Sequence, residues 1–397
     1  MRTMSKAPTY RGNVYSPEAI SNPYPIYTEL RALGPIVWLQ RHRAYALTGY
    51  EECRQTLLDD STFISGRGVA LNAIANRLSR GTTLNSDGED HTDRRKLVAH
   101  RLTPRALRSM REAIETTAEQ VATQAVARGQ VDGVAIARSL PLQVVPDLVG
   151  WPEDEREHLL KWASATFDIL GPINGTSMRS ATASLGMLRF ARRIARTENV
   201  LAGSMGAEVV AAANAGLIPK DAASALMIDY LAPSLDTTIS AISSALLLFA
   251  LHPDQWAEVR ADRTLIPNAV NEVIRLESPL RAFSRLTATD TTIAGINIRK
   301  GQRVVVLYAS GNRDEKAWDS PDVFDIHRDA TRHIGFGHGT HGCAGQGLAR
   351  LESHALLNAL ADRVQRIDLT GEPTWGRNNI IRALAELPLT LQPIEEN

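Results

Sequence analysis

The chain has 397 residues, which is enough to bury a large core, and its 44 Lys and Arg residues balance its 44 Asp and Glu residues. This balance excludes a globally basic nucleic-acid-binding protein and a protein held at an anionic membrane by its overall charge. The two cysteines, Cys53 and Cys343, are too few for a disulfide framework and favour a reducing compartment.

The amino-terminal segment 1–17 has no apolar core of the kind found in signal peptides. The longest apolar run, ISSALLLFAL, is too short and too interrupted to span a bilayer. We therefore expect a cytoplasmic protein with no membrane and no nucleic-acid partner.

The first predicted elements are a helix and a pair of strands. The stretch NPYPIYTELRALGP predicts a helix that is entered through Pro25 and ended by Gly34 and Pro35. The stretch that follows, IVWLQRHRAYALTGY, alternates like two short strands. From about residue 88 to 270, apolar residues return at spacings of three and four, which is typical of amphipathic helices. This part is expected to form the α-rich bulk of the protein.

A long helix is predicted from about Asp221 to Leu251, where His252 and Pro253 stop it. It is apolar on nearly every side, so we expect it to cross the middle of the protein. Pro233 lies in its interior, where it removes one backbone hydrogen bond and is expected to kink the helix.

Strand-like alternation returns in TTIAGINIRKGQRVVVLYAS and in ELPLTLQP near the carboxyl end. No repeat, low-complexity tract or linker divides the chain. We therefore predict one domain over residues 1–397, mainly α with small β-sheets (α+β). Its β-rich part is expected to comprise about residues 35–70, 280–310 and 380–395.

A glycine-rich stretch, FGHGTHGCAG at residues 336–345, is the most unusual local feature. Gly337, Gly339 and Gly342 satisfy the dinucleotide-binding pattern G-x-G-x-x-G. A dinucleotide loop requires a strand before the first glycine, however, and the charged residues that stand there do not form one. The nucleotide interpretation is therefore weak.

Two other interpretations of the same stretch involve its side chains. His338, His341 and Cys343 offer zinc ligands, but a fourth ligand and the usual zinc spacings are missing. Alternatively, the glycines let the backbone approach a flat group and direct one cysteine toward it. Backbone N–H groups near the sulfur would then lower its basicity.

The last interpretation agrees with a motif of a known protein family. Phe336-Gly337-x-Gly339-x-His341-x-Cys343-x-Gly345 resembles the haem-binding signature of the cytochrome P450 family. Other motifs of that family follow its order along roughly residues 20 to 395: His91-x-x-x-Arg95, the acid–alcohol pair Asp236-Thr237, Glu272-x-x-Arg275, and an arginine segment, PDVFDIHR, that ends at Arg328.

This resemblance implies the cytochrome P450 fold, with haem b between the long central helix and the cysteine-bearing loop, and a monooxygenase activity. It implies Cys343 as the axial ligand of the iron, because a thiolate ligand favours cleavage of the O–O bond of dioxygen. Phe336 and Gly337 would belong to the same cofactor-binding loop. Family positions place four residues around the two haem propionates: His91, Arg95, Arg285 and His341.

A buried network is implied for Glu272, Arg275 and Arg328, with a structural rather than a catalytic role. On spacing alone, Glu272 and Arg275 would be a solvated helix pair worth a few tenths of a kcal/mol. The resemblance therefore adds a prediction that the spacing does not make.

Protons must reach a mostly dry pocket during O–O cleavage, and a threonine hydroxyl fed by a carboxylate relays them. The resemblance assigns these catalytic roles to Thr237 and Asp236. An acid in the middle of an apolar helix is costly unless it is partnered or functional. The family usually has a small residue and a glycine before this pair, whereas this chain has Pro233 and Ser234, so the ring of Pro233 is expected to alter the space above the haem.

Electrons must come from another protein, because the chain contains no flavin or iron–sulfur segment. Residues 91–111 are rich in Lys and Arg. In this family that segment lies on the cysteine side of the haem, so the resemblance implies an acidic ferredoxin that docks there and a ferredoxin reductase that uses NAD(P)H. For about half of these Lys and Arg residues, the alternative is that they belong to an ordinary solvent-exposed helix face and have no partner protein.

The substrate is expected to be small and organic. Several stretches resemble family members that oxidise para-substituted aromatics such as methoxybenzoates, by hydroxylation or O-demethylation. Ten residues would surround the substrate: Arg67, Val69, Leu71, Asn72, Phe167, Leu170, Asp229, Pro233, Leu280 and Phe283. Those relatives hold a carboxylate with a serine and an arginine on the central helix, where this chain has Ile228 and Asp229. Asp229 repels a benzoate unless it is paired or protonated, so phenols, amines and neutral aryl ethers are also candidates.

Two other classes of protein remain open at this point. One is a haem-binding sensor without turnover, which the intact Asp236-Thr237 pair disfavours. The other is a biosynthetic relative that acts on a larger or carrier-bound substrate, which the short stretch GLIPKDAAS disfavours.

Overall fold

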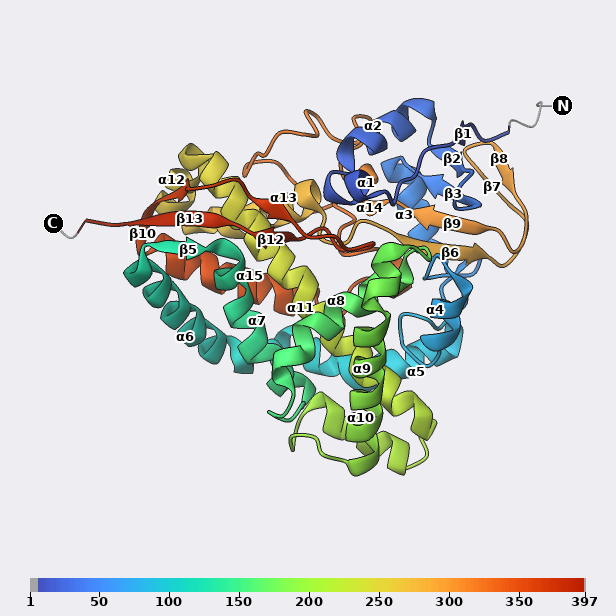
Figure 1. The fold of residues 1–397 in the computed structure, drawn as a ribbon, viewed down its shortest axis with the longest axis horizontal. Helices are drawn as coiled ribbons and strands as arrows, with labels where there is room; N and C mark the ends of the chain where they lie inside the picture. The colour runs from blue at the N-terminus through green and yellow to red at the C-terminus, as the bar shows by residue number, and fades with distance from the viewer. Residues whose placement is uncertain (1–5, 396–397) are drawn as a thin grey trace.

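The computed structural model describes residues 6–395, and its helices form the bulk of the protein beside small sheets (Figure 1). The α-helices are α1 (Pro17–Ser21), α2 (Tyr24–Leu33), α3 (Tyr50–Leu58), α4 (Ala73–Leu78), α5 (Gly88–Ala99), α6 (Pro104–Arg128), α7 (Gly133–Val149), α8 (Leu159–Leu170), α9 (Gly175–Thr197), α10 (Met205–Asn214), α11 (Lys220–Leu251), α12 (Pro253–Ala261), α13 (Ile266–Glu277), α14 (Tyr308–Gly311) and α15 (Gln346–Ala361). The strands are β1 (Thr9–Tyr10), β2 (Ile36–Leu39), β3 (Ala44–Leu47), β4 (Phe63–Ile64), β5 (Gln130–Asp132), β6 (Phe283–Thr287), β7 (Thr291–Ile293), β8 (Ile296–Ile298), β9 (Arg303–Val306), β10 (Val364–Leu369), β11 (Thr374–Trp375), β12 (Leu384–Glu386) and β13 (Pro388–Pro393). The predicted class, mainly α with small sheets, is confirmed.

Helix α11 is the predicted central helix, and it continues on both sides of Pro233. It runs through the middle of the molecule and packs against α7, α8, α9, α13 and α15 (Figure 1). Among residues 6–395 it is the one helix whose length and composition would suit a membrane span, yet 78% of that apolar stretch is buried inside the protein. Its apolar residues on all sides therefore serve the core.

A six-stranded sheet joins two distant parts of the chain, in the order β1-β2-β3-β9-β6-β4. The two strands predicted after α2 are confirmed as β2 and β3, which pair antiparallel with Ile36 opposite Leu47. Strand β9 joins β3 in parallel, and β6 joins β9. Cys53 is fully buried beneath this sheet in α3, where its Sγ contacts the carbonyl oxygen of Leu47 at 3.4 Å.

The expectation that residues 380–395 belong to the same β-rich part is wrong. Strand β13 pairs antiparallel with β10 and β5 in a separate three-stranded sheet, which lies among the helices (Figure 1). Leu389 and Leu391 alternate along β13 and are buried in the main core with α6 and α7. The burial of these two side chains places the strand on the helical side of the protein. An isolated bridge from Leu280 to Ile381 connects the carboxyl-terminal segment to the rest of the chain near the first sheet.

Candidate active site

The glycine-rich stretch 336–345 forms an irregular loop that leads directly into α15. Gly337 and Gly339 have φ angles of +70° and +67°, which residues with a side chain rarely adopt. A Cβ atom on Gly339 would also lie 2.6 Å from the backbone oxygen of Leu57 in α3. The glycines are therefore required for the close packing that fixes the loop against α3.

The two simpler interpretations of this stretch fail. Residues 326–338 lie in turns and irregular segments, so no strand feeds the first glycine and the frame of a dinucleotide site is absent from this part of the described chain. Within residues 6–395, no group of three or more His, Cys, Asp and Glu side chains is arranged to hold a metal ion. His338, His341 and Cys343 therefore do not form a zinc site.

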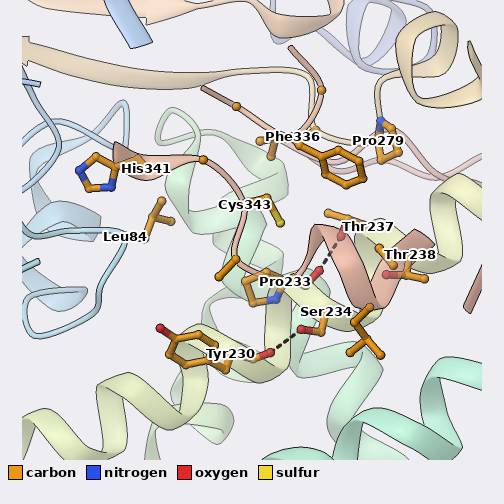
Figure 2. A pocket seen from close by; sticks show the side chains of 18 of the residues that line it. Leu84, Tyr230, Pro233, Ser234, Thr237, Thr238, Pro279, Phe336, His341 and Cys343 are labelled. Atoms are coloured by element: carbon orange, nitrogen blue, oxygen red, sulfur yellow. Dashed lines mark hydrogen bonds between the residues drawn. The ribbon is translucent and has the colours of Figure 1, made fainter. Parts of the chain in front are cut away.

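A cavity separates the glycine-rich loop from α11 (Figure 2). Cys343 lies on the loop side, together with Phe336, and Pro233 and Thr237 lie on the α11 side. Most of the wall is apolar. The cavity thus has one sulfur on one wall and a helix on the opposite wall, with room for a flat group between them.

The environment of Cys343 influences the charge of its sulfur in two directions. Burial raises the pKa of the thiol, while the backbone N–H groups of Gly345 and Gln346 and the guanidinium of Arg95 act to lower it. The backbone N–H of Cys343 donates to the carbonyl oxygen of Phe336 at 2.8 Å, which fixes the backbone of the loop at the cysteine. A metal ion at the sulfur would favour the thiolate outright.

Four basic side chains lie together in the wall of the cavity: His91, Arg95, Arg285 and His341. The rings of His91 and His341 have centroids 4.2 Å apart, and burial lowers the pKa of both, to about 3 for His341. Both ring nitrogens of His91 are buried without a hydrogen-bond partner within residues 6–395. Arg95 reaches from α5 to the loop, where Nη2 donates to the carbonyl oxygen of Gly342 at 2.7 Å. Unpaired imidazole nitrogens beside arginines fit the two carboxylates of a haem.

The α11 wall carries the predicted threonine. Thr237 Oγ1 donates to the carbonyl oxygen of Pro233 at 2.5 Å, and Ser234 Oγ donates to that of Tyr230 at 2.6 Å (Figure 2). Both hydroxyl-bearing residues line the cavity. The helix therefore presents hydroxyl groups to the same space as the cysteine.

Asp236 lies on the same helix, α11, but does not line this cavity. It lines a second pocket, with Lys161 and Ser164 of α8 and with Arg377. Its Oδ2 is buried without a hydrogen-bond partner in the described part of the chain. Burial raises the pKa of Asp236 to about 7, and a hydrogen bond with Ser164 opposes this rise. The acid and the alcohol of the predicted pair thus face different spaces across α11.

Glu272 lies at the centre of the predicted network. Arg275 Nε and Nη2 donate to its two carboxylate oxygens at 2.6 and 2.8 Å, and both side chains are fully buried. Arg328 Nε donates to Glu272 Oε1 at 3.1 Å. Arg275 Nη1 also donates to the carbonyl oxygens of Asn312 and Pro321, each at 2.8 Å. The network therefore ties α13 to the irregular segment that precedes the cysteine loop.

Five of the ten residues expected around the substrate line the cavity: Phe167, Asp229, Pro233, Leu280 and Phe283. Arg67 does not, and its side chain is exposed to solvent. Its neighbours Gly68 and Val69 pack against β6, where the backbone N–H of Ser284 donates to the oxygen of Val69 at 3.1 Å. This packing buries Val69 outside the cavity wall and turns Arg67 outward.

The remaining three expected residues lie behind the wall, at the junction of α4 and α8. The backbone N–H of Leu71 donates to the oxygen of Leu170 at 2.8 Å. Asn72 caps α4 by accepting from the N–H of Ala75 at 2.8 Å, and its amide donates to the carbonyl oxygens of Ile169 and Gly171. These residues support the wall rather than line it.

Several lining residues were not anticipated: Thr83, Leu84, Tyr230, Ser234, Ile274 and Tyr308. Tyr230 and Ser234 share a helix face with Pro233 and Thr237, so their spacing of three and four residues would have identified them. Thr83 and Leu84 lie in an irregular segment before α5, where no periodic pattern exists to find them.

An α-rich fold with one cysteine facing a central helix across a cavity, and a His and Arg cluster in the cavity wall, defines a haem-thiolate protein. Comparison with known proteins agrees. The family model described as Cytochrome P450 matches residues 199–365. The chain is 35% identical over 378 residues to Cytochrome p450 CYP199A2 of Rhodopseudomonas palustris, which covers 94% of this chain and 92% of that protein. The chain belongs to the cytochrome P450 family, and it is a monooxygenase whose cofactor is haem with a cysteine thiolate as the axial ligand.

The names of other relatives indicate varied functions. The chain is 29% identical to the Biotin biosynthesis cytochrome P450 of Bacillus subtilis, over 97% of this chain and all of that protein. It is 30% identical to a Steroid C26-monooxygenase of Rhodococcus jostii, over 92% of this chain and 81% of that protein. The crystal structure of P450BioI in complex with an acyl carrier protein matches with a TM-score of 0.84 and 29% identity, over 94% of this chain and all of that one.

Proposed function

We propose that this monooxygenase inserts one oxygen atom of O2 into a small aromatic substrate, by hydroxylation or O-demethylation, in the cytoplasm. The observation that carries the proposal is the cavity in which Cys343 faces Thr237, with Phe167 and Phe283 among the lining residues. The likeness to CYP199A2 over nearly the whole chain supports it.

In this proposal the cofactor is held by residues from three parts of the chain. Cys343 is the axial ligand, on the loop that Gly337 and Phe336 shape. Four side chains bind the propionates: His91, Arg95, Arg285 and His341. When bound, the haem supplies the activation of dioxygen, which thiolate ligation favours. The glycine-rich loop brings the sulfur close, and the apolar wall excludes bulk water.

Proton supply falls to α11. Thr237 Oγ1 holds a proton at the cavity wall, where the carbonyl oxygen of Pro233 fixes the hydroxyl. Asp236 lies on the other side of the helix, and a carboxyl group whose pKa is about 7 takes up and releases protons readily near neutral pH. A rotation of its side chain would carry a proton from the second pocket toward Thr237.

A separate ferredoxin and its reductase are proposed as the electron source, from NAD(P)H. Four Lys and Arg side chains of residues 91–111 pair with acids: Arg94, Lys96, Arg101 and Arg111. Arg105 and Arg108 of α6 are exposed and form no ion pair within residues 6–395. Leu107, between them, packs beside Gly347 at the start of α15, so this part of α6 lies next to the helix that follows Cys343. The two arginines would attract an acidic partner.

The docking surface is tested by charge reversal. Replacing Arg105 and Arg108 by Glu should slow reduction by the ferredoxin about tenfold at low ionic strength, and the difference should shrink as salt is added. The matched control reverses Arg128 at the far end of α6. Equal reduction rates of the Arg105/Arg108 variant and the unaltered protein would exclude this docking surface.

The proposed activity is tested by turnover of the purified holoprotein with a ferredoxin, its reductase and labelled O2. We expect one labelled oxygen atom in hydroxylated products, or formaldehyde from aryl methyl ethers. Cys343→Ser should abolish turnover, and Thr237→Ala should yield peroxide instead of product. If only carrier-bound acyl chains are oxidised, the biosynthetic function, which the P450BioI likeness favours, replaces this one.

A further inference from the structure

One carboxylate in the cavity wall has no role in the proposed oxygen chemistry. Asp229 lies one turn before Pro233 on α11, and both residues line the cavity. The backbone N–H of Thr83 donates to Asp229 Oδ2 at 2.7 Å, and that of Leu84 approaches the same oxygen at 3.4 Å. The side chain of Thr83 also acts on the carboxylate as a hydrogen-bond donor, and within residues 6–395 both main-chain donors bind Oδ2 and none binds Oδ1. Asp229 is thus held in place by the segment at Thr83 and Leu84, and its carboxylate lines the cavity with Oδ1 free of main-chain donors.

No cationic side chain of the described chain forms an ion pair with Asp229. Burial raises its pKa to about 6, so the group is mostly ionised at neutral pH, and Arg94 has the smallest of the opposing influences. Arg94 itself pairs with Asp90 at 3.3 Å. Arg67, which was expected to lie beside the substrate, is exposed to solvent outside the cavity. The charge of Asp229 is therefore left for the substrate to compensate.

Pro233 alters the surroundings of a main-chain oxygen at the same place. Proline has no N–H, so the carbonyl oxygen of Asp229, four residues earlier, receives no main-chain hydrogen bond from it. Carbonyl groups of a helix point toward its carboxyl end, so this oxygen is directed toward Pro233. The carboxylate of Asp229 therefore lies beside a main-chain oxygen that lacks its usual donor and that the ring of Pro233 partly covers.

We propose that this end of the cavity binds the protonated amine of a small aromatic substrate, with Asp229 as its anionic partner. The inference rests on the proposed monooxygenase function and names the substrate class. An ammonium group supplies a positive charge and several N–H donors, which match the carboxylate of Asp229. The rings of Phe167, Phe283 and Tyr230 line the same cavity and suit an aromatic cation.

The spacing along α11 also fits such a substrate. Asp229 and Thr237 are two turns apart, which corresponds to about 12 Å along the helix. This is roughly the length of a para-substituted arylalkylamine together with one hydrogen bond. An amine held at Asp229 therefore directs the para substituent to the place where Thr237 faces Cys343.

The test is an optical titration of the ferric holoprotein with three probes that share a para-methoxyphenyl group. They are para-methoxybenzylamine, para-methoxybenzyl alcohol and para-methoxybenzoate, and the readout is the low-spin to high-spin shift. The amine should bind at least about tenfold more tightly than the alcohol, because hydrogen bonds to charged groups exceed neutral ones. Asp229→Asn should remove this preference and leave the affinity for the alcohol unchanged. Asp221→Asn, which changes the same charge at the exposed start of α11, should retain the preference.

Several results would overturn the proposal. These are tightest binding of the benzoate, an amine preference that survives in Asp229→Asn, no shift with any probe, or direct ligation of the iron by the amine, seen as a red-shifted spectrum. None of these results contradicts the proposed monooxygenase function, which is judged separately by product formation from other aromatics. Loss of the haem-thiolate spectrum of the reduced carbon monoxide complex would overturn both.

Discussion

Glu352 offers the sharpest test of how burial controls this protein's stability. It lies in α15, fully buried, and within residues 6–395 neither of its carboxylate oxygens has a hydrogen-bond partner. Burial raises its pKa from 4.5 to about 8. The folded protein therefore holds a proton on Glu352 across a pH range in which the unfolded chain has already lost it. The effect of Glu352 on the unfolding free energy is negligible below about pH 4.5, and it becomes increasingly unfavourable as the pH rises toward about 8. Ionised Glu352 in the folded protein therefore costs on the order of 5 kcal/mol.

Glu352→Gln removes this titration while it keeps the shape of the side chain. Relative to the unaltered protein, the variant should gain about 3 kcal/mol of unfolding free energy between about pH 5.5 and about pH 8. Other acids with raised pKa values, such as Asp236, titrate equally in both proteins and cancel from the difference. Guanidinium unfolding of the two holoproteins, followed by far-ultraviolet circular dichroism, measures it. Glu112→Gln, at an exposed site on α6, is the matched control and should show no such gain. A difference that stays constant with pH would refute the reasoning.

Three further variants probe the site and its support. Glu272→Gln should lower the unfolding free energy by about 3 to 5 kcal/mol and reduce haem content, because it weakens the partner of the buried Arg275; an unchanged thermal midpoint would contradict this. Gly339→Ala should destabilise the protein by about 2 kcal/mol more than Gly216→Ala, which has a similar positive φ but open space, and thermal unfolding of both decides it. Asp236→Asn should slow turnover by about tenfold to a hundredfold and remove the decline in rate that we expect as pH rises through about 7; a pH profile that keeps this decline would assign it to another group.

The parts of the fold that the sequence predicted are those that local patterns determine. Helix α11 was found because its apolar residues and the stop at Pro253 are local signals, and β2 and β3 because they alternate beside a turn. Strand β5 was missed because three residues between two long helices carry no periodicity. The partners of β13 are far away in the sequence, so its alternation predicted a strand but not a sheet.

The same division holds for the site. Cys343 and the cluster around His91 were identifiable because motifs fix residue types at fixed spacings. The orientation of Asp236 was not, because α11 turns adjacent residues to different sides, and only the packing of α8 shows which space each one faces. Arg67 shows the limit of resemblance, since a residue can be retained at its position while the packing of Gly68 on β6 turns its side chain to solvent.

Pro233 links the two ends of the α11 wall. Its carbonyl oxygen accepts the hydroxyl of Thr237, so the part of the helix that we propose supplies protons keeps an ordered hydroxyl. Its missing N–H leaves the carbonyl oxygen of Asp229 without its usual donor, so the negative end of that dipole adds to the field of the carboxylate at the other end. Any other residue at this position would supply that N–H and cancel the second effect while leaving the first. If the proposal holds, Pro233 therefore acts on substrate recognition more than on oxygen chemistry, and Pro233→Ala should change the amine preference while Thr237 keeps its hydrogen bond.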